Sequence, residues 1–477
     1  MKVKNIDDVF SFKVWLPILV VFIYILCKIF LFNTGFFWDS VTVLCKPATY
    51  LYEHGLFHFH YPSEADNGDP QLVPFYIALM WTVFGKSLIV AHLSFIPVTI
   101  LILIQLYKFV TKVVSREFIP YIFILLAVDP TFMSMSSGLY QDAFVILFSL
   151  LLINAMLDKR KLGIGIYMAL LCLTSRRGIL LTFAFMLAYY VYTMYVLKVH
   201  FWNTIKLLFP VYLPAVLVVF SFITWRLYSY GWFFTTSQTD SGEITSFSGV
   251  LKNILALGRW FVDEGRLFVW LILGIALIKN KNRMALLSEN SLLLLVLLFM
   301  LIVMMSVTLP LKNPFGARYF AIHYMLIATI LAKVTMMYQP VKRVKQLILL
   351  STILLLSGNF WLYPEKLSQP WDSTLAYIPY FELKQQTIDY VAEKHVEFGS
   401  VGVEFPLTSE FRYIDANNDR RQFAHLDFHQ NRWIVYSNIF NLSDERIDSL
   451  RTWNLIKTFK KGTVFMKIYE NPNYSHE

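Results

Sequence analysis

Charged side chains are scarce in this sequence. Asp, Glu, Lys and Arg account for 16% of the 477 residues, whereas hydrophobic residues account for 57% and aromatic residues for 17%. Soluble domains carry about 25% charged residues, so a soluble fold of this length is excluded. The composition predicts an integral membrane protein.

Cysteine is rare, and glycine-rich phosphate-binding motifs are missing. The three cysteines, Cys27, Cys45 and Cys172, lie in or near apolar segments without metal-ligand spacing, and an odd number cannot pair completely, so we predict no structural disulfide. Neither G-x-x-x-x-G-K-[ST] nor G-x-G-x-x-G occurs, which argues against ATP-driven transport and against a cytoplasmic domain that uses nucleotide sugars. There is no local Ser-His-Asp or Cys-His signature and no internal repeat.

Long apolar runs are abundant before residue 364. Runs of roughly 16 to 24 residues can cross a bilayer as helices, and we count about eleven of them. They cover residues 15–33, 87–110, 118–136, 142–157, 162–175, 178–197, 207–228, 265–279, 290–310, 318–337 and 345–362. The sequence therefore predicts a polytopic α-helical membrane protein, and the first run, which lacks a small-residue cleavage site, is expected to stay as an anchor.

Basic residues indicate which side each loop faces. Lys2, Lys4 and Lys13 precede the first run, which places the N-terminus in the cytoplasm. Every loop that then lies on the cytoplasmic side is basic, with Lys108, Lys112, Arg116, Lys159, Arg160, Lys161, Lys198, Lys206, Lys279, Lys281, Arg283, Lys342, Arg343 and Lys345. An odd number of spans puts the segment after residue 363 outside, although miscounting one short run such as 162–175 would move it to the cytoplasm.

The composition changes at Pro364. From there to Glu477 the chain has 13 Lys and Arg but 16 Asp and Glu, so the net charge of +10 comes from residues 1–363 and is a topology signal rather than a nucleic-acid site. We predict a transmembrane module over 1–363 and a small extracytoplasmic α/β domain over 364–477. Its helix patterns lie at 382–393 and 444–452, the second with a cap at 441–443, and its strand patterns at 400–404, 433–436, 453–459 and 463–469.

The first external loop, residues 34–86, carries the main catalytic candidate. Asp39 follows an aromatic stretch just beyond the first apolar run, where a carboxylate can accept the proton of an attacking hydroxyl group beside a lipid headgroup. The alternative is a solvated carboxylate at the interface. Amphipathic stretches at 40–55, 75–85 and 250–261 favour helices that lie along the membrane surface.

This loop resembles the first external loop of the GT-C class of glycosyltransferases. Its order of features is similar to that of the protein O-mannosyltransferases and aminoarabinose transferases, grouped as glycosyltransferase family 39. Those enzymes carry an acid at the position of Asp39 and His-Pro-Pro-Leu or Lys-Pro-Pro-Leu at the position of Asp69-Pro70-Gln71-Leu72. Asp69, Gln71 and Ser40 depart from that pattern. The resemblance implies a sugar donor carried on a lipid phosphate.

Arginine residues are the candidates for binding the donor phosphate. Arg318 and Tyr319 begin an apolar run on the outer side, and many members of the resembling group carry an Arg-Tyr pair there. Arg176 and Arg177 lie between two short runs, also outside by the predicted topology, so an anion such as a lipid phosphate would compensate them. The alternatives are an interface anchor for Arg318 and a topology error for the adjacent pair.

Three further acids are candidates for binding the acceptor or shaping the site. Asp129 and Asp142 lie at the outer ends of neighbouring runs, and the resemblance implies an Asp that opens the fourth span near the active site. Asp69 stands where the resembling group has a basic residue. Helix capping is the alternative for Asp142.

No cofactor and no metal site are assigned. A divalent metal is the alternative, because the loop also contains His54, His58 and His60, with Glu64, Asp66 and Asp69. Their spacing matches no closed zinc pattern. The resemblance implies that donors with a single phosphate often need no ion.

These features predict an integral membrane glycosyltransferase of a bacterial inner membrane. It would move a hexose or pentose from a polyprenyl-phosphate carrier to a glycan, lipid or protein acceptor at the outer face. A transporter or flippase of lipid-linked sugars is one alternative, although it should place ionisable residues near mid-membrane. A ligase or polymerase of lipid-linked glycans is another, although it would lack the acidic first loop.

Overall fold

The computed structural model describes residues 12–232, 243–278, 289–312, 316–361, 363–472 and 474. Several residues used in the sequence analysis lie outside these ranges, namely Lys2, Lys4, Lys279, Lys281 and Arg283. The chain divides into two compact units. Unit 1 comprises Met1–Lys28, Phe59–Val73 and Phe95–Gly358, and unit 2 comprises Ile29–His58, Pro74–Ser94 and Asn359–Glu477.

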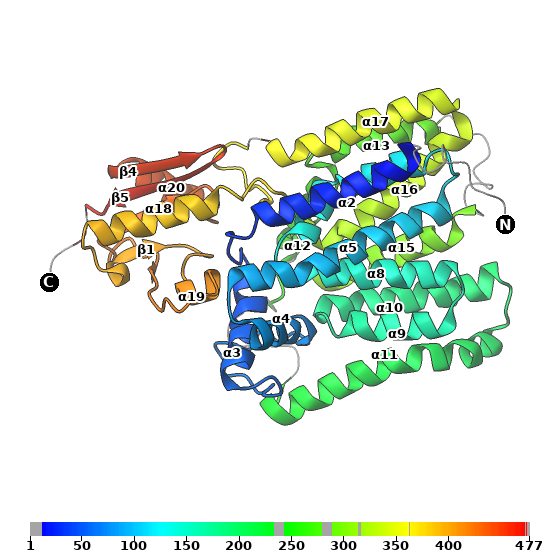
Figure 1. Ribbon diagram of the computed structural model, residues 1–477, viewed down its shortest axis with the longest axis horizontal. Helices are drawn as coiled ribbons and strands as arrows, with labels where there is room; N and C mark the ends of the chain where they lie inside the picture. Colours follow the sequence, from blue (N-terminus) through cyan, green and yellow to red (C-terminus); the bar gives the residue numbers. More distant parts are fainter. Residues whose placement is uncertain are drawn as a thin grey trace. The chain divides into compact units, whose positions relative to one another are not determined.

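Most of the described chain before residue 358 is helical (Figure 1). The helices are α2 (Phe12–Phe30), α3 (Lys46–His54), α4 (Leu72–Phe84), α5 (Leu88–Val113), α6 (Ile119–Ala127), α7 (Pro130–Ser137), α8 (Asp142–Leu157), α9 (Lys161–Cys172), α10 (Arg176–Val191), α11 (Phe201–Tyr230), α12 (Phe247–Val262), α13 (Arg266–Ile278), α15 (Ser291–Thr308), α16 (Ala321–Tyr338) and α17 (Val341–Ser357). Short π-helical or 3₁₀ segments include η1 (Val41–Cys45), η2 (Tyr192–Val196) and η4 (Ala317–Phe320).

Within the described ranges, five helices are long and apolar enough to cross a membrane. They are Leu88–Val113, Arg176–Val196, Phe201–Tyr230, Ser291–Thr308 and Ala317–Tyr338. The bent pair α6 and α7 makes a sixth candidate, and the shorter apolar helices include α8 and α9. A helix as short as α9 covers only about 18 Å at 1.5 Å per residue, less than a bilayer core of about 30 Å. The total of eleven spans stays a prediction.

Unit 1 is a bundle of these helices. Helix α10 packs on α15, α9 packs on both α8 and α11, and α13 packs on α16 and α17 (Figure 1). The packed faces are apolar, and α11 also exposes Phe209, Val216 and Phe220 along its length. Such a face is expected for a helix that contacts lipid.

The span predicted over 118–136 is two helices that meet at 71°. Pro130 lacks an N–H group and disfavours helical geometry at the residue before it, so the chain turns at Asp129. The Asp129 carboxylate accepts a hydrogen bond from the Phe132 N–H at 3.1 Å and thereby caps α7. Two side chains of α2 bind backbone carbonyls at the C-terminal ends of α6 and α7. The Tyr24 hydroxyl donates to the Ala127 carbonyl, and Lys28 Nζ donates to the Gly138 carbonyl at 3.1 Å.

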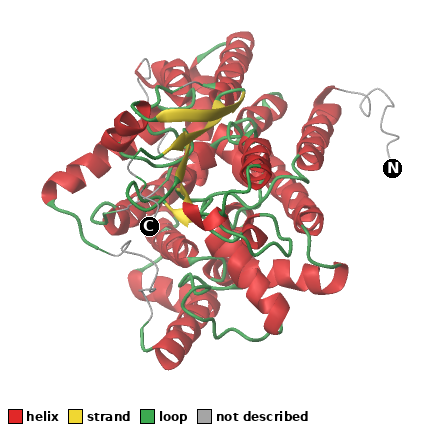
Figure 2. Ribbon diagram, turned by 90° about the vertical axis from the view of Figure 1, so that its left-hand side faces the viewer, coloured by secondary structure: helices red, strands yellow, loops and turns green. Residues whose placement is uncertain are grey.

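Unit 2 contains a five-stranded sheet with the order β2-β1-β3-β5-β4, whose strands are yellow in Figure 2. Strand β1 (Val401–Val403) pairs in parallel with β2 (Ala424–His425) and β3 (Trp433–Ser437), and β5 (Val464–Glu470) pairs antiparallel with β3 and β4 (Asn454–Lys461). Helices α18 (Tyr380–Glu393), α19 (Phe411–Ile414) and α20 (Asp444–Arg451) complete the domain. The predicted α/β character, the hairpin across Gly462 and the capped helix after Ser443 are confirmed.

The first external loop is divided between the two units. Its residues up to His58 belong to unit 2, where they pack on the residues that follow position 359. The amphipathic stretch at 40–55 forms η1 and α3, and the stretch at 75–85 lies within α4. Residues Phe59–Val73 belong to unit 1.

Candidate functional site

Asp39 begins a tight turn in unit 2. Its backbone carbonyl accepts hydrogen bonds from the Thr42 hydroxyl at 3.0 Å and from the Val43 N–H at 2.7 Å, and η1 follows at once. Trp38, directly before it, has a φ of 52°, a left-handed conformation that bulky residues rarely adopt. The Asp39 side chain is half-buried. The left-handed backbone conformation of Trp38 is strained, and such strain persists only where surrounding contacts hold the chain in place.

Those contacts come from the C-terminal domain. The Phe36 N–H donates to the Ile414 carbonyl at 2.7 Å, and the Phe37 ring stacks on Tyr377 with 4.2 Å between centroids. The Trp38 ring meets Phe405 edge-on at 5.4 Å. The segment that presents Asp39 is therefore held by residues from positions 377 to 414.

Glycine at position 35 permits this close approach. A Cβ atom there would lie 2.4 Å from the Ile414 carbonyl oxygen and 2.8 Å from Asp415 Oδ1. Asp415 is itself fixed by an ion pair with the buried Lys384. Burial lowers the pKa of Lys384, while the Asp415 charge opposes that shift.

In unit 1, Asp142 lies between two predicted phosphate-binding residues. Arg177 Nη2 is 2.6 Å from Asp142 Oδ1, and Arg318 Nε is 3.9 Å from Asp142 Oδ2. Both guanidinium groups also lie near the Tyr319 ring, at 4.1 Å for Arg177 and 5.3 Å for Arg318. Asp142 is the first residue of α8 and the acidic residue of its first turn, while Gln141 occupies the N-cap position. The structure thus brings together four residues that the sequence analysis singled out.

Asp69 orients the neighbouring arginine. Its Oδ1 accepts from both the backbone N–H and Nε of Arg176, each at 3.0 Å, and Arg176 Nη2 also donates to the Asn67 carbonyl at 3.1 Å. Ser175 caps α10 by accepting from the Gly178 N–H, which places Arg176 and Arg177 on the first turn. Arg176 also interacts electrostatically with Asp66 and with Tyr319.

A fourth arginine was missed by the sequence analysis. Arg226, near the C-terminal end of α11, is 1% exposed, and its Nη1 lies 2.7 Å from Asp66 Oδ1. Its guanidinium also covers the Tyr230 ring at 4.3 Å. Arg226 is an ionisable residue within α11, an apolar helix of thirty residues. Such a residue is a recognised signal of function, so the sequence alone could have pointed to Arg226.

These side chains form one set, which we call the arginine cluster. It has four guanidinium groups against three carboxylates, from Arg176, Arg177, Arg226, Arg318, Asp66, Asp69 and Asp142. The set therefore carries one positive charge in excess. Buried Nε and Nη1 of Arg177 have no hydrogen-bond partner among the residues that the structure describes. Buried donors without partners are costly, so the cluster is suited to an anion.

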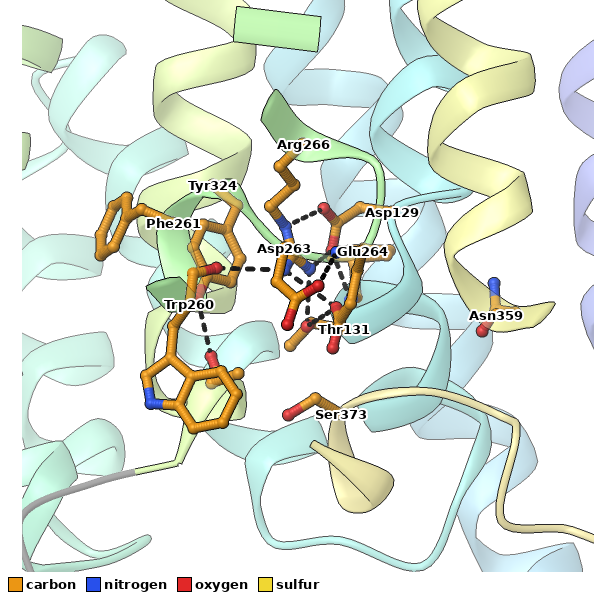
Figure 3. A network of polar contacts seen from close by, with 12 residues as sticks. Asp129, Thr131, Trp260, Phe261, Asp263, Glu264, Arg266, Tyr324, Asn359 and Ser373 are labelled. Carbon is orange, nitrogen blue, oxygen red and sulfur yellow. Dashed lines mark hydrogen bonds and ion pairs between the residues drawn. The ribbon is translucent and has the colours of Figure 1, made fainter. Parts of the chain in front are cut away.

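Asp129 belongs to a separate polar network, drawn in Figure 3. Its carboxylate receives Nε and Nη2 of the fully buried Arg266 at 2.9 and 3.0 Å, and Glu264 Oε2 lies 2.9 Å from Arg266 Nη1. Burial raises the pKa of Glu264, in the turn between α12 and α13, to about 8, although Arg266 opposes the shift. One guanidinium is thus shared between two carboxyl groups, those of Asp129 and Glu264.

The remaining predicted features are placed as follows. Within the described ranges, no three His, Cys, Asp or Glu side chains converge as metal ligands. The three cysteines are free thiols. Asp39 belongs to unit 2 and the arginine cluster to unit 1. That they meet in one site stays a prediction.

Comparisons with known proteins give a fold likeness. No protein-family profile matches the chain, and no curated protein matches it in sequence. The chain is similar in fold to the crystal structure of ArnT from Cupriavidus metallidurans bound to undecaprenyl phosphate, with a TM-score of 0.52 and 9% sequence identity. The likeness covers 98% of this chain and 100% of that one.

Proposed function

We propose that the protein is a membrane glycosyltransferase that takes its sugar from a polyprenyl-phosphate carrier. The observation that carries this proposal is the arginine cluster, in which Arg176 is partly exposed and the other guanidinium groups are largely buried. The cluster has an excess positive charge, and two donors of Arg177 have no partner among the described residues. The fold likeness to ArnT, whose structure holds undecaprenyl phosphate, supports a lipid phosphate as the anion. The reaction would occur at the outer face of a bacterial inner membrane, with the C-terminal domain outside.

The arginine cluster would bind the phosphate of the donor. Arg177 shares Asp142 with Arg318, and a phosphate can take up the buried Nε and Nη1 donors of Arg177 that have no partner among the described residues. Guanidinium groups stay protonated at any working pH and pair with two phosphate oxygens at once. They would stabilise the charge that grows on the phosphate as the bond to the sugar breaks.

Asp39 would act as the general base. It takes the proton from the acceptor hydroxyl group while that oxygen bonds to the anomeric carbon of the sugar. The bond from that carbon to the phosphate oxygen breaks, and the electron pair leaves with the polyprenyl phosphate. Asp69 would contribute indirectly, because it fixes the orientation of Arg176.

The test measures transfer from a radiolabelled polyprenyl-phosphate sugar by purified protein in lipid vesicles. Asp39→Asn should lower kcat by about 10²- to 10⁴-fold and leave the KM of the donor nearly unchanged. Arg318→Gln should weaken donor binding by roughly 10- to 100-fold, the effect of losing a charged hydrogen bond. Asp158 and Arg160 form an ion pair at 3.1 Å. Asp158→Asn and Arg160→Gln therefore serve as matched controls and should keep wild-type kinetics.

Transfer at the wild-type rate by Asp39→Asn would remove that carboxylate as the base. If the wild-type protein transfers no sugar to any acceptor but moves labelled lipid-linked sugar across the vesicle membrane, the protein is a flippase. Mass spectrometry of envelope glycans with and without the gene identifies the sugar and its acceptor.

A further inference from the structure

Arg266 is held rigidly by three side chains. Asp129 binds it through two nitrogens, Glu264 binds a third, and Thr131 Oγ1 accepts from Nη2 at 2.7 Å (Figure 3). Asp129 is the N-cap residue of α7 and Thr131 lies in the first turn of that helix, whereas Glu264 precedes α13. The guanidinium therefore ties two separate parts of unit 1 to one point.

The flat face of this guanidinium lies on Tyr324 of α16. Its carbon is 3.8 Å from the ring centroid, a close cation–π contact, and both side chains are buried. Phe261 of α12 packs edge-on against the same ring at 5.1 Å and against Phe320 at 5.3 Å. The ring of Tyr324 is thus fixed from two sides.

The Tyr324 hydroxyl reaches back to the residue before Arg318. It donates to the Ala317 carbonyl at 3.1 Å. Ala317 opens η4, a 3₁₀ turn of only four residues, and such turns have few hydrogen bonds of their own. The hydrogen bond that the Ala317 carbonyl accepts from Tyr324 therefore fixes the position of the backbone from which the Arg318 side chain extends.

We propose that Arg266 and Tyr324 are positioning residues that hold the η4 turn so that Arg318 meets the donor phosphate. Among the described residues, Asp142 forms its ion pairs with Arg177 and Arg318 and not with Arg266, and Tyr324 acts through the backbone of Ala317. The inference rests on the proposed function, because it requires Arg318 to bind the donor. It assigns a purpose to the Asp129–Arg266 network, which the proposed chemistry does not otherwise use.

Tyr324→Phe removes the one hydroxyl group and keeps the ring under Arg266. It should raise the KM of the lipid-phosphate sugar donor about 3- to 10-fold, the effect of one lost hydrogen bond, while kcat stays within about twofold. Arg266→Lys keeps a positive charge between the carboxylates but loses the flat face, so it should raise the same KM. Tyr212→Phe is the matched control, since its hydroxyl also donates to a backbone carbonyl, that of Met186 at 2.8 Å.

A double-mutant cycle with Arg318→Gln separates positioning from general loosening. If Tyr324 acts through Arg318, Tyr324→Phe has no further effect on donor KM once Arg318 is replaced. Additive effects, or an equal rise in KM for Tyr212→Phe, would overturn the inference. If Arg318→Gln alone leaves donor binding unchanged, the proposed role of Arg318 fails instead.

Discussion

Gly35 is a residue at which the chain tolerates little change. Its Cα lies so close to Ile414 that an added methyl group would meet the carbonyl oxygen at 2.4 Å. Gly35→Ala should therefore push the Asp39 segment off α19, at a cost of about 1–3 kcal/mol in unfolding free energy, as expected for overpacking. Transfer activity should fall with it.

Thermal unfolding and transfer assays on the same preparation check this. The matched control is Gly399→Ala, because a Cβ there meets only Glu397 Oε1, at an ordinary 3.8 Å. Equal stability and activity of the two variants would contradict the close contact.

Glu264 predicts a pH dependence of stability. Its pKa is about 8 in the folded protein, above the ordinary value of 4.5. Between these values the folded protein keeps a proton that the unfolded chain releases, so this contribution is complete below pH 4.5 and is lost as the pH rises through 8. The melting temperature should drop as the pH rises from about 5 to 8 and level off above 8, and Glu264→Gln should reduce that drop.

The control for this prediction is Glu445→Gln, which replaces an exposed glutamate at the start of α20. It should follow the wild-type curve. Parallel curves for wild type and Glu264→Gln would show that Glu264 does not titrate in this range.

Sequence reasoning found part of the site at this scale. Arg176 and Arg177 stood out because they run against the charge pattern of the loops, and the structure pairs both with predicted acids. Their partners could not be predicted, since pairing Asp69 with Arg176 depends on how α10 packs in three dimensions. Arg226 and Lys28 interrupt apolar runs, so their signal was present but unused.

Among the elements, the break between α6 and α7 shows what hydropathy alone cannot report. A window of apolar residues over 118–136 predicts one span, but Asp129-Pro130 in its middle is a signal for turning the chain. The turn is stable because Tyr24, Lys28 and Asp129 bind the exposed backbone groups. Tyr24 and Lys28 lie 103 and 110 residues away from the carbonyls that they bind, which is why only the break and its local cap by Asp129 could be foreseen.

The sheet of unit 2 also contains elements that the sequence predicts and elements that it does not. Strand β5 and its hairpin partner β4 were predictable, because alternating apolar residues flank Lys460-Lys461-Gly462. Strand β2 covers two residues and exists only through parallel pairing with β1. Helix α19 has four residues and owes its place to contacts with η1. Neither β2 nor α19 has a local sequence pattern that would predict it.

At the scale of the whole molecule, unit 2 joins residues from both ends of the chain. Ile434, in strand β3, is fully buried in the core of the C-terminal domain. Cys45 of η1 is also fully buried, and burial raises the pKa of its thiol to about 12, which keeps it unreactive. Ile434→Ala should cost about 2–5 kcal/mol and make Cys45 react faster with a maleimide, although the two residues lie far apart in sequence.

Two comparisons make the labelling experiment specific. Cys172 belongs to unit 1 and is equally buried, so its slow labelling should not change. Leu455→Ala, on an exposed position of β4, should leave both thiols protected. Faster labelling of Cys172 together with Cys45 would mean that the two units unfold as one.

The hydrogen bond from Phe36 to Ile414 also sets an order of events during synthesis. The turn at Asp39 is translated well before α19, yet it can reach its final conformation only once Ile414 has been made and its carbonyl can accept the Phe36 N–H. The segment that presents Asp39 therefore folds later than its place in the sequence suggests.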